Sequence, residues 1–268
     1  MERISMSDWW ILAVGGLGSG LLAGILGIGG GTVLVPILVS LGYSPVESVA
    51  TSILAIVMTS VSGTIQNWRM GYVDFKRVIW LGLPSLITAQ WGATLASTIP
   101  AYLLLAAFGV LLLVNIWLMI LRQRLMANQN GREEYSINPT LARLGTGGMA
   151  GLLAGLFGVG GGVIMVPLQM LLLGEKIKVA IQTSLGVIVI TSISACIGHA
   201  QRSNLLFWEG IILGTGGLLG AQLSTRYLPK LPNQVVNFSF RTLLVILAIY
   251  FLWRAVNSYN LMILPMDK

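Results

Sequence analysis

The stretch GLLAGILGIGGGTVLVP at residues 20–36 returns as GLLAGLFGVGGGVIMVP at residues 151–167. Eleven of the seventeen aligned positions are identical, and most of the others exchange one apolar residue for another. A self-match of this kind indicates an internal repeat, in which each copy builds one structural unit. The sequence therefore predicts two homologous halves.

The similarity between the halves extends beyond this stretch. The matching pairs further along the chain are Thr51-Ser52 with Thr183-Ser184, Thr59-Ser60 with Thr191-Ser192, and Gly92-Ala93 with Gly220-Ala221. We expect the first transmembrane repeat at residues 5–122 and the second at residues 140–256. The polar and charged residues 123–139 between them are predicted to form a cytoplasmic linker.

The composition is that of a membrane protein. Only 9% of the 268 residues are charged, whereas 55% are hydrophobic, and the mean hydropathy is +0.84. A soluble protein carries roughly 25% charged residues. A chain so poor in charge cannot cover its surface with groups that water solvates, so we expect a lipid bilayer around it.

Each half contains five apolar segments. In the first half they cover residues 9–26, 31–41, 46–66, 77–97 and 101–121, and in the second half residues 140–157, 162–173, 177–198, 207–225 and 233–254. The second segment of each half contains a proline and is too short to cross a bilayer alone, since crossing takes about 20 residues. We interpret residues 9–26 as retained structure and not as a removable signal peptide. The predicted fold class is all-α, a polytopic transmembrane helical bundle with discontinuous helices.

The short segments leave two topologies. If they cross or nearly cross, the halves are inverted and both termini lie outside. If the first two segments form one broken pass, the halves are parallel and both termini lie inside. Either model places eleven Lys and Arg residues inside and four outside, with the intrahelical Arg241 set aside. The positive-inside rule therefore places only the linker, and we favour the inverted repeat because it is a common transporter design.

Two glycine-rich elbows, residues 27–31 and 158–162, are the strongest candidates for function. Glycine runs break helices, and the helix that restarts presents unpaired N–H groups with a partial positive charge, which bind anions. The residues that we expect to bind substrate at the elbows are Gly29, Gly30, Gly31, Thr32, Gly160, Gly161, Gly162 and Val163. The alternative is that glycines serve close helix packing, as the spacing of Gly16, Gly20 and Gly24 indicates.

Hydroxyl groups line one side of the third segment in each half. Thr51 and Ser52, with their counterparts Thr183 and Ser184, are the further candidates for substrate binding. The pathway candidates are Thr59, Gln66, Asn67, Thr191 and His199. The alternative for any of these hydroxyls is a hydrogen bond to the preceding helical turn, which is common in membrane helices.

Other polar residues have structural interpretations. Ser44-Pro45-Val46-Glu47 is typical of a capping box, so Glu47 is not assigned to proton transfer. The one cysteine, Cys196, excludes an intrachain disulfide and is expected in packing. One histidine and no His/Cys/carboxylate cluster predict neither a metal site nor a cofactor. The Lys and Arg residues that give the net charge of +7 lie in short segments between the apolar stretches, so no nucleic-acid partner is expected.

The doubled glycine element, followed by Ala50-Thr51-Ser52-Ile53 in one half and Thr183-Ser184-Leu185 in the other, resembles the sulfite exporter TauE/SafE family. The resemblance covers nearly the whole chain. It implies a bacterial inner-membrane transporter of sulfite, organosulfonates or related sulfur compounds. Isoleucine at position 53, where the family motif has leucine, is a mild departure.

We therefore predict a transporter of a small anion, with the substrate and the lipid bilayer as partners and a homo-oligomer left open. The sequence has two competing interpretations: a membrane assembly or scaffold protein without transport, and a membrane-embedded enzyme. The enzyme has little support, because no nucleophile–base pair or phosphate loop is visible. The scaffold predicts that the elbows tolerate Gly→Ala wherever the helices can still pack.

Overall fold

The computed structural model describes residues 6–127 and 138–263, and within these residues the regular elements are all helices. In chain order they are α1 (Met6–Leu26), α2 (Gly31–Ser40), α3 (Pro45–Arg69), α4 (Phe75–Thr98), α5 (Ala101–Ala127), α6 (Pro139–Phe157), α7 (Gly162–Leu172), α8 (Ile177–Ala200), α9 (Phe207–Tyr227), the 3₁₀ turn η1 (Leu228–Lys230) and α10 (Asn233–Ile263). The all-α prediction is confirmed, and each of the ten expected segments corresponds to one α-helix.

Local signals in the sequence set where the helices begin. At α3 the Ser44 hydroxyl accepts from the N–H of Glu47 at 3.3 Å, and the Glu47 carboxylate accepts from the N–H of Ser44 at 3.1 Å. This is the capping box expected from the sequence, with Pro45 in the first helical turn. At α4 the Asp74 carboxylate accepts from the N–H of Arg77 at 3.2 Å.

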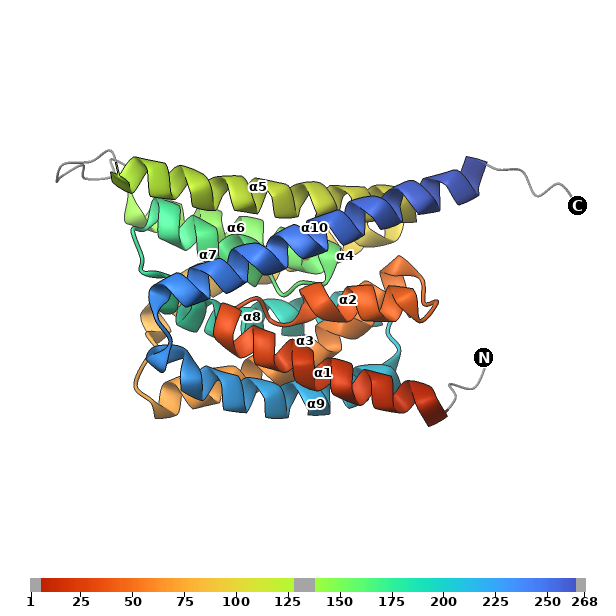
Figure 1. Ribbon diagram of the computed structural model, residues 1–268, viewed down its shortest axis with the longest axis horizontal. Coiled ribbons are helices and arrows are strands. Elements are labelled where there is room, and N and C mark those ends of the chain that lie inside the picture. The colour runs from red at the N-terminus through yellow and green to blue at the C-terminus, as the bar shows by residue number, and fades with distance from the viewer. Residues whose placement is uncertain (1–5, 128–137, 264–268) are drawn as a thin grey trace, which may run out of the picture.

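The two short helices, α2 with 10 residues and α7 with 11, each follow a glycine elbow and contain a proline. At 1.5 Å per residue such a helix spans about 15 Å, half of a bilayer core. They begin at Gly31 and Gly162, where the short segments expected from the sequence begin. In Figure 1, α1 and α2 run in opposite directions on either side of their elbow.

The first helix of each half packs mainly on the fourth helix of the other half. α1 lies along α9, and α6 lies along α4 (Figure 1). The α3 and α8 helices contact each other at the centre and also pack on α9 and α4 respectively, whereas α5 pairs with α10. The bundle is therefore built crosswise, and neither half closes on itself.

Close approach at these crossed contacts depends on glycine. A Cβ atom added to Gly20 of α1 would lie 2.1 Å from the carbonyl oxygen of Gly217 in α9. A Cβ atom added to Gly147 of α6 would lie 2.0 Å from the carbonyl oxygen of Leu81 in α4. The packing face predicted from glycines spaced by four is confirmed.

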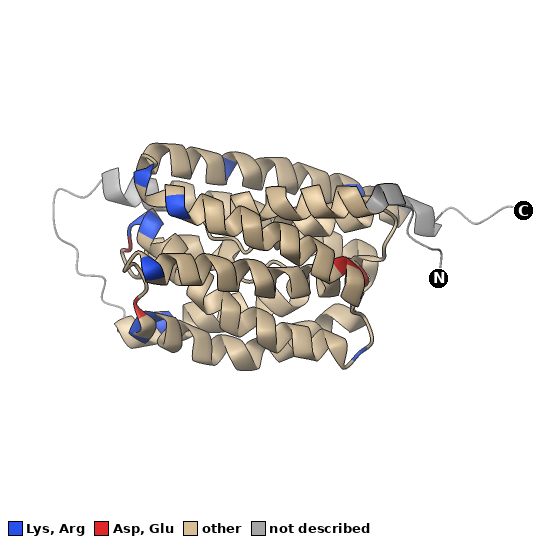
Figure 2. Ribbon diagram, turned by 90° about the horizontal axis from the view of Figure 1, so that it is seen from below, with Lys and Arg blue, Asp and Glu red and all other residues tan. Residues whose placement is uncertain are grey.

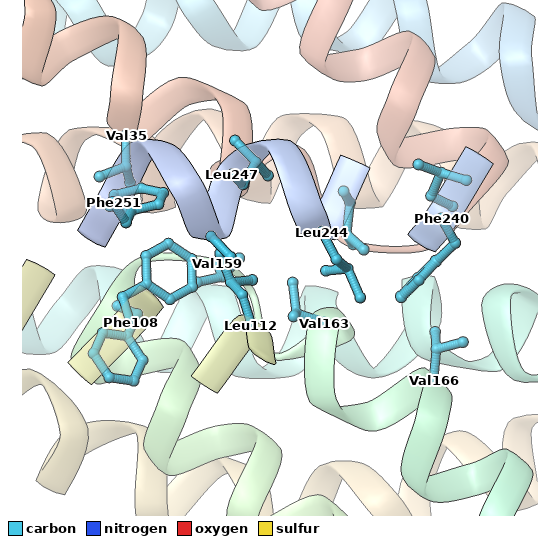
Figure 3. Packing of buried hydrophobic residues seen from close by; sticks show 14 of the residues in the cluster. Val35, Phe108, Leu112, Val159, Val163, Val166, Phe240, Leu244, Leu247 and Phe251 are labelled. Carbon is cyan, nitrogen blue, oxygen red and sulfur yellow. The ribbon is translucent and has the colours of Figure 1, made fainter. Parts of the chain in front are cut away.

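Apolar side chains fill the space under α10. Phe240, Leu244, Leu247 and Phe251 of α10 face Val163 and Val166 of α7, Val159 of the second elbow and Phe108 of α5 (Figure 3). The rings of Phe108 and Phe251 meet edge-on with their centroids 4.4 Å apart. Cys196 is half-buried and packs against this cluster, as expected for a cysteine used in packing.

The outer surface is apolar in a way that only lipid can solvate. Large side chains such as Trp10, Trp91, Trp208 and Phe238 are 65–74% exposed. Six helices of the described chain are long and apolar enough to span a membrane. α6 and α9 fall outside that group although they have 19 and 21 residues, because five glycines in each lower their hydropathy. The molecule is a multi-pass membrane protein.

Charged residues collect mainly at one end of the bundle, where α5 ends and α6 begins (Figures 1 and 2). There Arg77 forms ion pairs of 2.9 Å with Asp74 and with Glu175, which join the α3–α4 loop to the α7–α8 loop. The start of α1 and the end of α10 lie at the opposite end (Figure 1). Inverted halves require the start of α1 and the end of α10 to lie opposite the end where α5 meets α6. Which of the two ends faces the cytoplasm stays a prediction.

Candidate functional site

Each elbow is a run of glycines in the left-handed backbone region. The φ angles of Gly27, Gly29 and Gly30 are 67°, 74° and 87°. In the second elbow Gly158, Gly160 and Gly161 have φ angles of 68°, 70° and 78°. Side-chain-bearing residues rarely adopt these angles, so the elbow conformation depends on glycine. The two elbows have closely similar backbones.

The elbows contact each other in the middle of the bundle. A Cβ atom on Gly31 would lie 2.0 Å from the carbonyl oxygen of Gly158. Likewise, a Cβ atom on Gly162 would lie 2.1 Å from the carbonyl oxygen of Gly27. The N-termini of α2 and α7, which begin at these two glycines, are thus brought to one place.

Each elbow is connected to the opposite half by one serine. The Ser52 hydroxyl in α3 is 3.0 Å from the carbonyl oxygen of Gly158, and the Ser184 hydroxyl in α8 is 2.8 Å from that of Gly27. Each hydroxyl also lies 2.8 Å from a carbonyl of its own preceding turn, that of Val49 or Ile181. The structure therefore brings both predicted serines to the elbows, where they bind carbonyl groups.

The amide groups of the elbows lack partners. In the described chain no protein acceptor is found for the N–H groups of residues 28–32, in the first elbow and the first turn of α2. The same holds for residues 159–164, in the second elbow and the first turn of α7. The residues of both runs are buried. Buried N–H groups without partners are rare in proteins and cost several kcal/mol each in a fully apolar medium. These two runs are an unfilled set of hydrogen-bond donors.

Two isoleucines cover the amide cluster. Ile56 of α3 and Ile188 of α8 each approach both elbows: Ile56 lies against Gly29, Gly31 and Gly160, and Ile188 against Gly29, Gly160 and Gly162. Both isoleucines have no exposed surface. Of the two cavities described, one is lined by α1 and α2 at the outer surface and one by apolar side chains around Phe108, and neither is lined by an elbow glycine. The elbows are sealed from solvent in this conformation.

The remaining predicted binding residues differ in what they offer. Thr32 is fully buried, and its hydroxyl has no hydrogen-bond partner in the described chain. The Val163 side chain points into the apolar cluster, so only its N–H faces the elbow (Figure 3). Thr51 accepts from the N–H of Leu206 at 3.2 Å, and Thr183 is buried. Thr51 therefore supports the α8–α9 loop.

The pathway candidates divide into helix-bonded and interhelical groups. The hydroxyls of Thr59 and Thr191 donate to the carbonyls one turn earlier, at 2.9 and 2.6 Å, as in the alternative considered for them. Gln66 accepts from the side-chain amide of Gln222 at 2.8 Å and so links α3 to α9. Thr59 and Thr191 therefore bond within their own helices, whereas Gln66 joins two helices.

Asn67 and His199 behave differently. They occupy matching positions near the ends of α3 and α8, and both are fully buried. Neither polar atom of the Asn67 amide has a partner in the described residues. His199 Nε2 is 2.8 Å from the carbonyl oxygen of Gly155, and its Nδ1 is unpartnered within the described chain. These are buried polar groups with capacity to spare.

Sequence reasoning missed Ile56 and Ile188, because an apolar residue in an apolar helix carries no chemical signal. The one clue was position: each lies four residues after the serine that reaches the opposite elbow. Since residues four apart share a helix face, the isoleucines had to face the same region as Ser52 and Ser184. As for metals, no group of three or more His, Cys, Asp or Glu gathers within the described ranges.

Comparison with known proteins agrees with this architecture. Residues 12–251 match the family model described as sulfite exporter TauE/SafE. The chain therefore belongs to the TauE/SafE family, a class of membrane transporters.

Its curated relatives carry names of the same class. Among them is the probable membrane transporter protein YunE of Bacillus subtilis, 25% identical over 92% of this chain and 98% of its own. A probable membrane transporter protein of Xylella fastidiosa is 27% identical over 89% of this chain and 93% of its own. These names are those of transporters and not of enzymes.

Proposed function

We propose that this chain carries a small anion across the bacterial inner membrane, and that the anion is sulfite, a sulfonate or another sulfur-containing oxyanion. The observation that supports this most is the pair of buried amide runs at residues 28–32 and 159–164, for which the described chain offers no acceptor. Amide donors at two helix N-termini favour negative charge without a charged side chain. An oxyanion with several acceptor oxygens matches such a set of donors.

The proposed binding residues are those that surround the two helix starts. They are Gly29, Gly30, Gly31, Thr32, Thr51, Ser52, Gly160, Gly161, Gly162, Val163, Thr183 and Ser184. The glycines and Val163 contribute backbone N–H groups, whereas the Thr32 hydroxyl is a buried group without a partner. Ser52 and Ser184 hold the elbow carbonyls, which keeps those negative dipoles turned away from the amides.

Transport requires that the sealed centre opens. Ile56 and Ile188 are the side chains that cover the amides, so they are the proposed barrier in this closed conformation. Anion access from either side requires these two methyl-rich side chains to move away from the elbows. Transporters with inverted halves and broken helices do this by rocking one group of helices against the other around a fixed site.

A charge test at Ile188 separates an anion site from a packing site. Ile188→Glu places a carboxylate against the elbow amides, where it would occupy the donors that the substrate needs. Ile188→Gln is the matched control, with the same shape and no charge. We expect reconstituted Ile188→Glu to lose at least about tenfold in flux of labelled sulfite, equivalent to 1.4 kcal/mol of competing stabilisation, while Ile188→Gln retains flux.

Thermal unfolding in detergent accompanies the flux measurement. A carboxylate that binds the amides should leave Ile188→Glu at least as stable as Ile188→Gln, because the donors gain a charged acceptor. If Ile188→Glu instead unfolds much earlier than Ile188→Gln and both folded proteins show equal flux, the elbows are not an anion site. If the purified wild-type chain moves neither sulfite nor simple sulfonates, the proposal fails as a whole.

A further inference from the structure

His199 is a buried titratable group that the proposed anion site does not use. Of the His, Asp, Glu, Lys and Arg side chains described, it alone is fully buried. It lies near the end of α8, next to the last turn of α6, the helix that leads into the second elbow. Such a group inside a membrane bundle is costly to keep unless it has a function.

The hydrogen bonding of His199 fixes its tautomer. Nε2 lies 2.8 Å from the carbonyl oxygen of Gly155. A carbonyl oxygen only accepts, so Nε2 carries the hydrogen in the neutral ring and Nδ1 carries a bare lone pair. Nδ1 is buried and has no partner in the described chain. The ring therefore has one vacant proton-accepting atom.

The described neighbours of the His199 ring include several neutral groups and one guanidinium. α6 presents the carbonyl of Gly155, and α4 contributes Gln90 beside Gly198 and Thr94 beside Arg202. The charged group near this end of α8 is Arg202, which follows the helix in the α8–α9 loop and donates to the carbonyl of Gly198. The Glu47 carboxylate at the start of α3 accepts a hydrogen bond from the Ser44 hydroxyl.

Gly155 lies three residues before Gly158, where the second elbow begins. The end of a helix favours a nearby cation because its last carbonyls carry partial negative charge. An anion at the elbow amides would add a full negative charge near this end of α6 and offset Arg202. The site would then favour the imidazolium form.

We propose that His199 takes up a proton when an anion occupies the elbow site, so that anion binding and proton binding strengthen each other. This inference rests on the function proposed above. The proton comes from water, attaches to the Nδ1 lone pair, and returns to water when the anion leaves. By linkage, each ligand raises the affinity of the other by the same factor.

The first half supplies the matched variant. Asn67 occupies the position that corresponds to His199, and it is also fully buried. His199→Asn therefore installs the residue that the other half already accommodates in this place. The asparagine amide cannot bind a proton. His199→Gln, with a longer amide side chain, is the second variant.

The test measures flux into proteoliposomes between about pH 5 and 8, the range in which histidine titrates. The probes are labelled methanesulfonate, which keeps its charge over this range, and labelled sulfite. Taking the ratio of wild type to His199→Asn cancels the ionisation of sulfite itself. We expect the wild-type apparent affinity to rise by up to about tenfold for each unit fall in pH, and that of both variants to stay flat.

Proton uptake provides a direct second measurement. Adding methanesulfonate or sulfite to the wild type in weakly buffered detergent solution should raise the pH by up to one proton per chain, beyond what a buffer blank shows. If His199→Asn reproduces the wild-type pH profile, or if the wild type binds anion without proton uptake, the coupling is wrong while anion transport stands. If neither anion binds or moves with the wild type, both proposals fail.

Discussion

At the scale of single residues, the centre of the molecule depends on a few short contacts between the halves. The Ser52 and Ser184 hydroxyls each bind a carbonyl of the opposite elbow, at 3.0 and 2.8 Å. Each of these carbonyls belongs to a glycine whose φ angle is positive, at a turn that interrupts the helices. The hydrogen bonds from the two hydroxyls therefore stabilise the left-handed turns.

We expect Ser52→Ala and Ser184→Ala to destabilise the protein, because each leaves a buried carbonyl without its interhelical donor. The expected loss is about 1–3 kcal/mol for each variant. Ser60→Ala is the control, since the Ser60 hydroxyl is also buried in α3 but donates only to its own helix, at the carbonyl of Val57. Thermal unfolding in detergent compares the three, and equal stability would contradict a structural function for the crossed bonds.

The sequence predicted that Ser52 and Ser184 lie near the elbows, but not what they bind. Both serines were candidates because they recur at matching positions in the third segment of each half. Their acceptors lie more than a hundred positions away along the chain. The same is true of one of the two elbows that each of Ile56 and Ile188 contacts. Partners of this kind depend on how the helices assemble, and spacing within one segment carries no information about that.

At the scale of helices, glycine on one face determines which pairs lie closest. α1 and α6 each carry such a face. α1 packs against α9, which has five glycines, and α6 packs against α4, which has two glycines and Pro84. Helix boundaries were predictable to within a few residues because glycine, proline and capping residues act locally. The identity of the partner helix was not, since every glycine face in the chain has a similar composition.

Alanine substitutions at matched glycines test this packing. Gly20→Ala and Gly147→Ala place a methyl group about 2 Å from a backbone carbonyl oxygen, and we expect each to cost about 1–3 kcal/mol. Gly18→Ala and Gly145→Ala are controls in the same two helices, with no heavy atom within 4 Å of the added methyl. The controls should be neutral or stabilising by about 0.5–1 kcal/mol, because alanine is the better helix former.

Unfolding temperatures of the four variants test whether α1 packs on α9 and α6 on α4. If Gly20→Ala and Gly18→Ala unfold at the same temperature as each other, α1 does not lie against α9 in the membrane-embedded protein. The same comparison of Gly147→Ala with Gly145→Ala applies to α6 and α4. Agreement of both pairs with expectation would support the crosswise assembly, which no single-helix property predicts.

At the scale of the whole molecule, charge and connectivity point to one orientation. The end of the bundle where α5 ends and α6 begins also carries most of the described Lys and Arg residues (Figure 2). The positive-inside rule predicts that this end faces the cytoplasm. The α3–α4 loop and the α8–α9 loop correspond to each other in the two halves, so they should lie on opposite sides if the halves are inverted.

Cysteine labelling decides this orientation. In a Cys196→Ser background, Tyr72→Cys marks the α3–α4 loop and Gln201→Cys the α8–α9 loop, and both positions are exposed. We expect a membrane-impermeant maleimide to label Gln201→Cys in intact spheroplasts and Tyr72→Cys only after permeabilisation. Labelling of both from the same side would show parallel halves, and the reverse result would show that the linker faces outward.

The crosswise pairing has a consequence for biosynthesis. α1 leaves the ribosome long before its main partner α9, which begins only at Phe207, after all of the first half and most of the second have been made. The glycine face of α1 must therefore remain in lipid, or against an insertion factor, through most of translation. A ribosome that stops after the linker would release a fragment in which α1 and α4 both lack the helices they pack against, so quality control should clear such fragments quickly.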